Sequence, residues 1–269
     1  MSQSFRANPP DPLEYEAESD RLFVKSAAKA VRVLSAFHAA HGPLSLSEIA
    51  KKAAIDRSSA QRIVHTLMLS GHLRRSADDQ GYLPGIRLLD HTLDVLRLDP
   101  VIQKATPVLL ELRKAVRERV DLSLFHANRL VYALRMQSKR ETFYATLVGH
   151  SVPLYCTAGG RAILAVMPEE DARAHLGPSP LPSYTRDTRT DVDDIMDSLK
   201  EAQRDGFAIV IGEFAQGEIA LGVAITQDSG EPLGAIHVAG SLSEWTPDSF
   251  IQHVAPLATA AAREVIVSL

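Results

Sequence analysis

The chain has 269 residues, of which 45% are hydrophobic and 23% are charged, a composition typical of globular proteins with room for two domains. No apolar run approaches the roughly 18–20 residues that span a bilayer, and the polar N-terminus lacks the apolar core of a secretory signal. We therefore expect no membrane partner. The single cysteine, Cys156, excludes an internal disulfide framework and favours a cytoplasmic location.

The net charge of −4 hides an uneven distribution along the chain. Residues 1–21 carry two basic and five acidic side chains, residues 22–90 carry ten basic and five acidic, and residues 91–269 carry 17 basic and 23 acidic. A basic module attached to an acidic body indicates polyanion binding at one end only. The first segment, 1–21, is acidic and poor in core-forming residues, and is predicted to be a disordered tail.

The first helices are predicted from 26 onward. Apolar residues recur at helical spacing until a Gly-Pro stop after His41. A short helix over 46–53 follows, in which Ser45 and Glu48 have the spacing of a capping box.

A third helix is predicted over 57–70, with Asp56 as its N-cap and Gly71 at its C-terminus. Two compact helices with a short connection, the second one basic at its start, are typical of a helix-turn-helix.

Two extended segments, 72–75 and 82–84, flank a polar turn and predict a β-hairpin wing. A helix over 86–98 then carries Ile86, Leu89, Leu93 and Leu96 on a narrow apolar seam. This linker helix either pairs with a copy of itself in a dimer or lies against the body of its own chain.

The remaining chain predicts one α+β domain. The expected helices cover 107–119, a segment from Cys156 to Met167, 191–204 and 247–267. The expected strands cover 120–126, 130–136, 143–148, 207–211, 219–226 and 233–238.

Base edges in a major groove are reached from the N-terminal half of a recognition helix, and a wing contacts the DNA backbone or the minor groove. The candidate DNA-binding residues are Arg57, Ser58, Ser59, Gln61, Arg62 and His65 on the third helix and Arg74, Arg75 and Tyr82 on the wing. The alternative is a solvated basic face on an ordinary helical hairpin.

Three stretches resemble the IclR-type family of bacterial transcriptional regulators: the helix-turn-helix over 46–67, the segment 149–162, and the segment 233–240. The resemblance extends over nearly everything from Phe23 to Leu269. It implies a GAF-like effector domain whose pocket holds a small organic acid.

The candidate effector-binding residues are Ala158, Gly159, Gly160, Val210, Ala220, His237 and Ala239. The first three open a helix, whose N–H groups and dipole favour a carboxylate, although the glycines can instead serve tight helix–sheet packing. The last four match positions where some relatives carry Asp, Cys, Ser and Ser, so this pocket is expected to be less polar and to take a larger, aromatic acid. His237 is then the main hydrogen-bonding group, unless it is a structural histidine.

A cysteine-dependent hydrolase built around Cys156 is the rival hypothesis, because a helix N-terminus lowers a thiol pKa. No motif supplies a third catalytic group, and the histidines lack metal-ligand spacing. We therefore expect a protein that is not an enzyme, with no cofactor and no metal.

The sequence predicts an α+β fold with an N-terminal winged helix-turn-helix (22–85), a linker helix (86–99) and a C-terminal GAF-like effector-binding domain (100–269). The expected partners are a pseudo-palindromic double-stranded DNA operator, a small organic acid and a second copy of the chain, with a homotetramer as the larger alternative.

Overall fold

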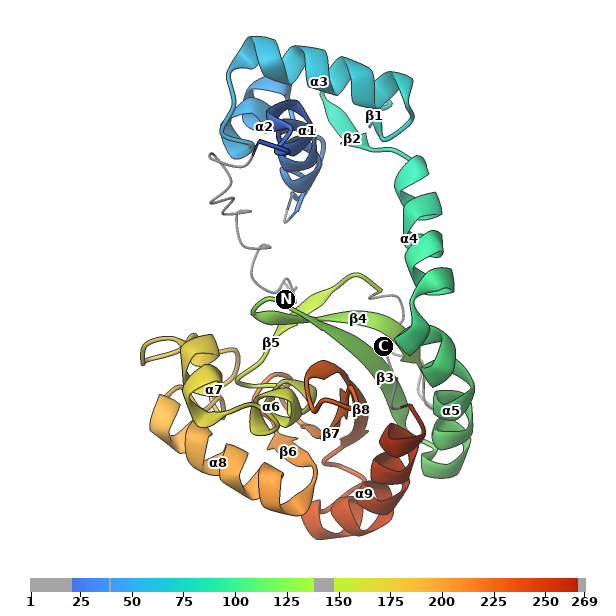
Figure 1. Ribbon diagram of the computed structural model, residues 1–269, viewed down its shortest axis with the longest axis vertical. Coiled ribbons are helices and arrows are strands. Elements are labelled where there is room, and N and C mark those ends of the chain that lie inside the picture. Colours follow the sequence, from blue (N-terminus) through green and yellow to red (C-terminus); the bar gives the residue numbers. More distant parts are fainter. Residues whose placement is uncertain (1–20, 39, 138–147, 266–269) are drawn as a thin grey trace. The chain divides into compact units, whose positions relative to one another are not determined.

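The computed structural model describes residues 21–38, 40–137 and 148–265 (Figure 1). The chain divides between Val95 and Leu96 into two compact units. No helix in the described ranges is long and apolar enough to cross a membrane.

The first unit is a small helical domain with a two-stranded hairpin. Its elements are α1 (Lys25–Ser35), α2 (Leu46–Lys52), α3 (Arg57–Leu69), β1 (Leu73–Arg75) and β2 (Tyr82–Pro84). Helix α4 (Arg87–Leu98) contains the division between the units.

Local signals start α2 and α3 at the predicted residues. The Ser45 hydroxyl accepts from the backbone N–H of Glu48 and the Glu48 carboxylate accepts from that of Ser45, which completes the predicted capping box. The Asp56 carboxylate accepts from the N–H of Ser59 at 2.8 Å. Both caps satisfy N–H groups that have no partner within the first turn.

Helix α1 is shorter than predicted. It ends at Ser35, because the N–H groups of Phe37 and His38 bond to carbonyls only three residues back and tighten the chain into a turn. The predicted Gly-Pro stop therefore lies beyond the end of the helix. The hairpin wing is confirmed, with Leu73 opposite Pro84 and Arg75 opposite Tyr82.

One apolar core holds the first unit together. Its buried side chains come from all three helices and from the wing: Val33, Ala36, Leu44, Ile49, Ala53, Val64 and Leu73. The exposed face of α3 is therefore displayed on a rigid base.

The second unit is an antiparallel sheet between two layers of helices. Its helices are α5 (Pro100–Val116), α6 (Ala158–Ala165), α7 (Glu169–Leu176), α8 (Val192–Asp205) and α9 (Pro247–Glu264). Its strands are β3 (Arg119–His126), β4 (Arg129–Met136), β5 (Ser151–Pro153), β6 (Ala208–Ile211), β7 (Glu218–Thr226) and β8 (Pro232–Ser241).

The six strands are ordered β5-β4-β3-β8-β7-β6. Figure 1 shows α5 and α9 together on one side of the sheet and α6 to α8 on the other. Alternate residues of β3 enter different cores: Val120 and Leu122 pack toward α5 and α9, whereas Asp121 and Ser123 face the side of α6. The polar residues of the sheet therefore collect on the α6 side.

Helix α5 begins seven residues before the predicted start at Pro107. Asp99 accepts the N–H of Ile102 at 3.0 Å and Pro100 occupies the first turn, which together outweigh the loss of one helical hydrogen bond at Pro107. The apolar face continues past Pro107 to Leu109 and Leu112, which holds the helix on the sheet.

The other predicted elements of this unit are found within a few residues of their predicted bounds. Strand β5 and helix α7 were not predicted, because a three-residue strand and a short polar helix carry weak periodic signals. The strand predicted over 143–148 falls on residues that, apart from Val148, lie outside the described ranges.

Candidate DNA-reading surface and effector pocket

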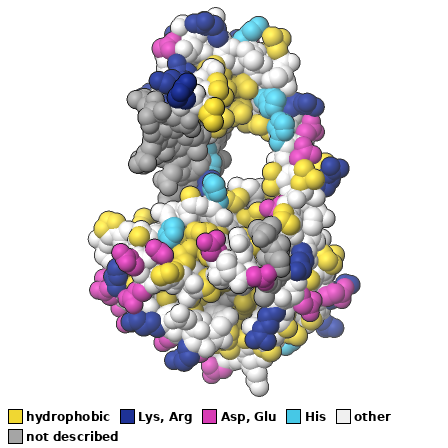
Figure 2. All heavy atoms as spheres, in the orientation of Figure 1, with side chains coloured by type: hydrophobic (Ala, Val, Ile, Leu, Met, Phe, Trp, Pro, Cys, Tyr) yellow, Lys and Arg dark blue, Asp and Glu magenta, His cyan; other side chains and the backbone are white. Residues whose placement is uncertain are grey.

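Helix α3 displays a polar face on the first unit. Arg57, Gln61, Arg62 and His65 are exposed, and none of their side chains has a hydrogen bond or ion pair among the described residues. Figure 2 shows Lys and Arg side chains over the end of this unit where Figure 1 draws α3. This face is free to bind a groove lined with phosphates and base edges.

The two serines of the predicted set take part in the helix start. The Ser58 hydroxyl donates to the Asp56 carboxylate at 2.6 Å, and Ser59 is half-buried. These hydrogen bonds hold the pKa of Asp56 well below its ordinary value. Because Asp56 remains ionised, the cap persists over the whole physiological range.

The side chains of the two arginines on the wing differ in their contacts. Arg75 forms an ion pair with Asp79 at 3.0 Å and lies 4.5 Å above the ring of Tyr82, whereas Arg74 is exposed with no partner in the described part of the chain. Arg74 is therefore the freer phosphate ligand of the two.

A polar contact joins the end of α3 to α4 within the first unit. The Ser70 hydroxyl lies 2.8 Å from Nδ1 of His72, and Nε2 of His72 lies 2.8 Å from Nε2 of His91. The two rings stack with an interplanar angle of 15°. A shift of α4 at His91 would therefore move His72, which directly precedes the first strand of the wing.

In the second unit, a pocket lies on the α6 side of the sheet. It is lined by Arg119, Tyr132, Cys156, Thr157, Ala158, Val210, Gly212, Glu213, Phe214, Ala215, Glu218, Ala220, His237 and Ala239. Five of the seven predicted effector residues are in this lining, and Gly159 and Gly160 are not. The cavity volume is about 20 Å³, which is room for one water molecule, so a larger ligand must displace part of the wall.

His237 lines the pocket and is buried. Its Nε2 is 2.6 Å from the hydroxyl of Ser123, its only hydrogen-bonding partner among the described residues. Burial, together with the positive charges of Arg119 and Arg135, lowers the pKa of His237 to about 3. The ring is therefore neutral at physiological pH, and one nitrogen remains for a ligand.

The glycines at the start of α6 pack against the sheet. A Cβ on Gly159 would lie 2.1 Å from the His237 ring, and one on Gly160 would lie 2.2 Å from the carbonyl oxygen of Leu154. A Cβ on Gly222 of β7 would similarly lie 2.2 Å from the backbone of Ala158. These distances leave no space for a side chain, which is the packing role that the sequence left open as the alternative to ligand binding.

A buried ion pair joins α6 to the loop after β6. Arg161 donates to both carboxylate oxygens of Glu213, at 2.8 and 2.6 Å, and its Nε donates to the carbonyl of Tyr155 at 2.8 Å. Glu213 also accepts from the backbone N–H of Arg189 at 3.0 Å. Both members of the pair are almost fully buried.

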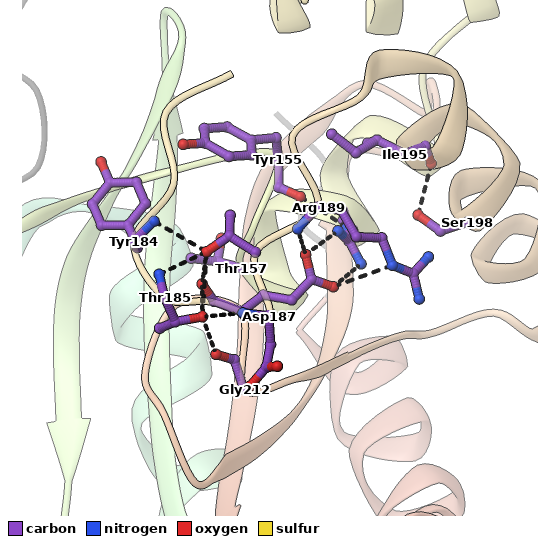
Figure 3. A network of polar contacts seen from close by, with 12 residues as sticks. Tyr155, Thr157, Tyr184, Thr185, Asp187, Arg189, Ile195, Ser198 and Gly212 are labelled. Atoms are coloured by element: carbon purple, nitrogen blue, oxygen red, sulfur yellow. Dashed lines mark hydrogen bonds and ion pairs between the residues drawn. The ribbon is translucent and has the colours of Figure 1, made fainter. Parts of the chain in front are cut away.

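Figure 3 shows the loop residues that these polar contacts join, among them Thr185, Arg189 and Gly212. The Thr185 hydroxyl donates to the carbonyl of Gly212 at 2.7 Å. The network therefore holds together the residues that form one wall of the pocket.

Comparison with known proteins places both units in one family. The model of the IclR helix-turn-helix domain matches residues 26–77, and that of the bacterial transcriptional regulator IclR C-terminal domain matches residues 93–267. The chain belongs to the IclR family of bacterial transcriptional regulators. The helix-turn-helix is thus a DNA-binding domain, and the second unit is an effector-binding domain.

Individual relatives are similar to this protein over almost the whole length of the chain. The Pca regulon regulatory protein of Pseudomonas putida is 26% identical over 247 residues, covering 91% of this chain and 84% of that protein. The crystal structure of the Thermotoga maritima IclR is 27% identical with a TM-score of 0.67, covering 89% of this chain and 96% of that one. An IclR homologue from Microbacterium hydrocarbonoxydans, complexed with 4-hydroxybenzoate, is 24% identical with a TM-score of 0.70 and covers 89% and 97% of the two chains.

The IclR family consists of DNA-binding regulators, so the hydrolase alternative is not supported. The environment of Cys156 agrees with this. The thiol is fully buried and burial raises its pKa far above the ordinary range, so it is not the thiolate that a nucleophilic mechanism needs. The described residues contain no cluster of three metal-ligating side chains.

Sequence reasoning missed the charged groups of this IclR-family effector domain. Arg119, Glu213 and Glu218 line the pocket, and Arg161 is the buried partner of Glu213. Arg161 follows the predicted glycines directly, and a charged residue at the start of an otherwise apolar helix was the only signal available. Arg119 and Glu218 lie 99 residues apart, and only the sheet brings them together.

Proposed function

We propose that this IclR-family regulator responds to an aromatic carboxylic acid that binds between β3, β6, β7 and β8 of the second unit. The observation that carries this proposal is the pocket lining. Val210, Ala220 and Ala239 offer apolar surface, Tyr132 and Phe214 offer aromatic rings, and neutral His237 supplies a hydrogen bond.

Two relatives support the choice of ligand class. The Pseudomonas putida protein is a regulator of the Pca regulon, and the Microbacterium hydrocarbonoxydans homologue binds 4-hydroxybenzoate in the same fold. In this chain, a phenolic or carboxylate oxygen would bond to His237, while Ala158, Gly159 and Gly160 would set how closely the ring approaches α6. Gly159 and Gly160 act there through packing.

For DNA, we propose that α3 enters the major groove and that Gln61, Arg62 and His65 read base edges. Arg57, Ser58 and Ser59 lie at the positive end of the helix dipole, near a phosphate. Arg74 would contact the backbone, with Arg75 and Tyr82 in the minor groove or on the sugar edge.

A homodimer would place two recognition helices on a pseudo-palindromic operator. Three members of the predicted seam, Ile86, Leu89 and Leu93, are each more than half exposed, which suits pairing with the same helix of a second copy, whereas the fourth, Leu96, packs against the core of the second unit. Pairing of dimers would give a homotetramer. We further propose a cytoplasmic location and a domain division into 1–21, 22–85, 86–99 and 100–269.

The test is selection of genomic fragments by the purified protein, followed by exposure of the complexes to a panel of aromatic and aliphatic acids. We expect enrichment of a palindrome whose affinity one aromatic acid changes. Release by a short aliphatic acid alone would refute the aromatic assignment. Failure to enrich any fragment, with or without the acids, would refute autonomous operator binding.

A further inference from the structure

The charged side chains that line the effector pocket differ in whether they are available to bind a ligand. Three of its lining residues carry a formal charge: Arg119, Glu213 and Glu218. Glu213 is held in bidentate fashion by Arg161, so neither member of that pair is free for a ligand. Arg119 and Glu218, whose side chains are 17% and 27% exposed, are the charges that remain.

Arg119 has one permanent partner and one exchangeable partner. Its Nε donates to Asp121 at 3.0 Å, and its Nη1 donates to Glu218 at 2.8 Å. Asp121, the third residue of β3, is completely buried, so its carboxylate cannot rotate into solvent. Glu218 is the first residue of β7 and is partly exposed, so its side chain can rotate into solvent.

The guanidinium also has unused capacity. Nη2 of Arg119 has no partner among the residues that the structure describes, and neither does the hydroxyl of Tyr132, which lines the same pocket. A carboxylate replacing that of Glu218 would therefore find a two-pronged donor, Nη1 and Nη2, of the geometry that Arg uses for carboxylates.

The other candidates for anion binding are already occupied. The Thr157 hydroxyl accepts the N–H of Gly160 at 3.3 Å and Gly159 is covered by the His237 ring, so the start of α6 offers little to a ligand. His237 itself is neutral. Among the described residues that line the pocket, Arg119 is thus the cationic group that can exchange one of its partners for a ligand.

We propose that Arg119 binds the carboxylate of the effector and that Glu218 is an internal competitor, which occupies Arg119 until the effector displaces it. This proposal rests on the proposed function, an aromatic acid in this pocket. Asp121 remains the buried counter-ion and orients the guanidinium. Rotation of Glu218 also enlarges a cavity that is otherwise too small for an aromatic ring, so a neutral analogue that cannot replace Glu218 should bind poorly.

The exchange is tested with two probes, 4-hydroxybenzoate and its uncharged isostere 4-hydroxybenzamide. Calorimetry on the purified full-length protein gives the affinity of each, and their ratio measures recognition of the charge. In Glu218→Gln the competitor loses its charge but keeps its shape. We expect about tenfold tighter binding of the acid, as for loss of a hydrogen bond to a charged group, and little change for the amide.

In Arg119→Met we expect at least tenfold weaker binding of the acid and a ratio near one. This variant leaves the buried Asp121 with only its ion pair to Arg135, at 3.7 Å, so its fold is checked by circular dichroism. Glu218→Gln tests the proposal independently, because Arg119 and Asp121 remain paired in it. Glu231→Gln, an exposed substitution in the turn between β7 and β8, is the matched control and should keep the wild-type ratio.

The outcomes separate the two proposals. Wild-type protein that binds neither probe would overturn the aromatic-acid assignment, and this inference with it. Wild-type protein that prefers the acid, together with a Glu218→Gln variant of unchanged affinities, would overturn the role of Glu218 and Arg119 alone.

Discussion

The two units display their functional groups in opposite ways. On α3 the side chains of Arg57, Gln61, Arg62 and His65, which we propose face DNA, are exposed and unpaired among the described residues, and the core beneath them does not include them. In the effector domain the polar groups around the pocket are buried and already paired, as Arg161 is with Glu213 and His237 with Ser123. Substitutions should therefore separate function from stability in the first unit and couple them in the second.

The substitution expected to have the largest effect on stability is Arg161→Met. It leaves the Glu213 carboxylate buried without its bidentate partner, and we expect the effector domain to lose about 3–5 kcal/mol of unfolding free energy. Chemical denaturation monitors the loss. Lys200→Met, which removes an exposed ion pair of 2.9 Å with Asp197, should cost no more than about 0.5 kcal/mol. Equal costs for the two variants would remove the distinction.

The second test is Gly159→Ala. Its new Cβ would collide with the His237 ring, so we expect a destabilisation of about 1–3 kcal/mol and a loss of effector response. DNA binding by the first unit should persist where the protein remains folded. Gly42→Ala, with no atom within 4 Å of the new Cβ and an ordinary φ, is the control and should be close to neutral.

A third test uses pH. The pKa of His237 is lowered to about 3, so between that value and its ordinary 6.5 the unfolded state binds the extra proton. Stability should therefore fall as the pH drops below about 6.5, by about 2 kcal/mol at pH 5 from this residue. The measurement is the unfolding free energy at pH 5 and pH 8 for the wild type and for His237→Gln. An identical difference in both proteins would contradict the neutral, buried ring.

The smallest effect on stability is expected on α3. Gln61→Ala should change the unfolding free energy by less than about 0.5 kcal/mol, yet cost about 1–3 kcal/mol of binding at particular base pairs. Arg74→Ala should instead weaken all sequences similarly and reduce the salt dependence of binding. Both are measured by titration against a panel of operator variants. A uniform loss for Gln61→Ala would refute its reading role.

The sequence by itself determined the features that depend on neighbours along the chain. Ser45, Glu48 and Asp56 cap helices through bonds to residues three positions away, and the two-residue period of the hairpin strands is local as well. Helices α2 and α3 and the wing were therefore predicted almost to the residue. The pattern of residues along both domains was also sufficient to indicate the family. Helix α5 was misplaced because a proline was taken for a start when tertiary packing carried the helix through it.

Only the tertiary structure decided the effector pocket. Gly159 suits both a ligand-binding backbone and tight packing, and the choice depends on His237, 78 residues away, lying over it. Arg119 and Glu218 carry no motif, and their ion pair exists because β3 and β7 both pair with β8. The charge and hydrogen-bonding state of a buried group depends on neighbours that the fold supplies, and these are distant in sequence.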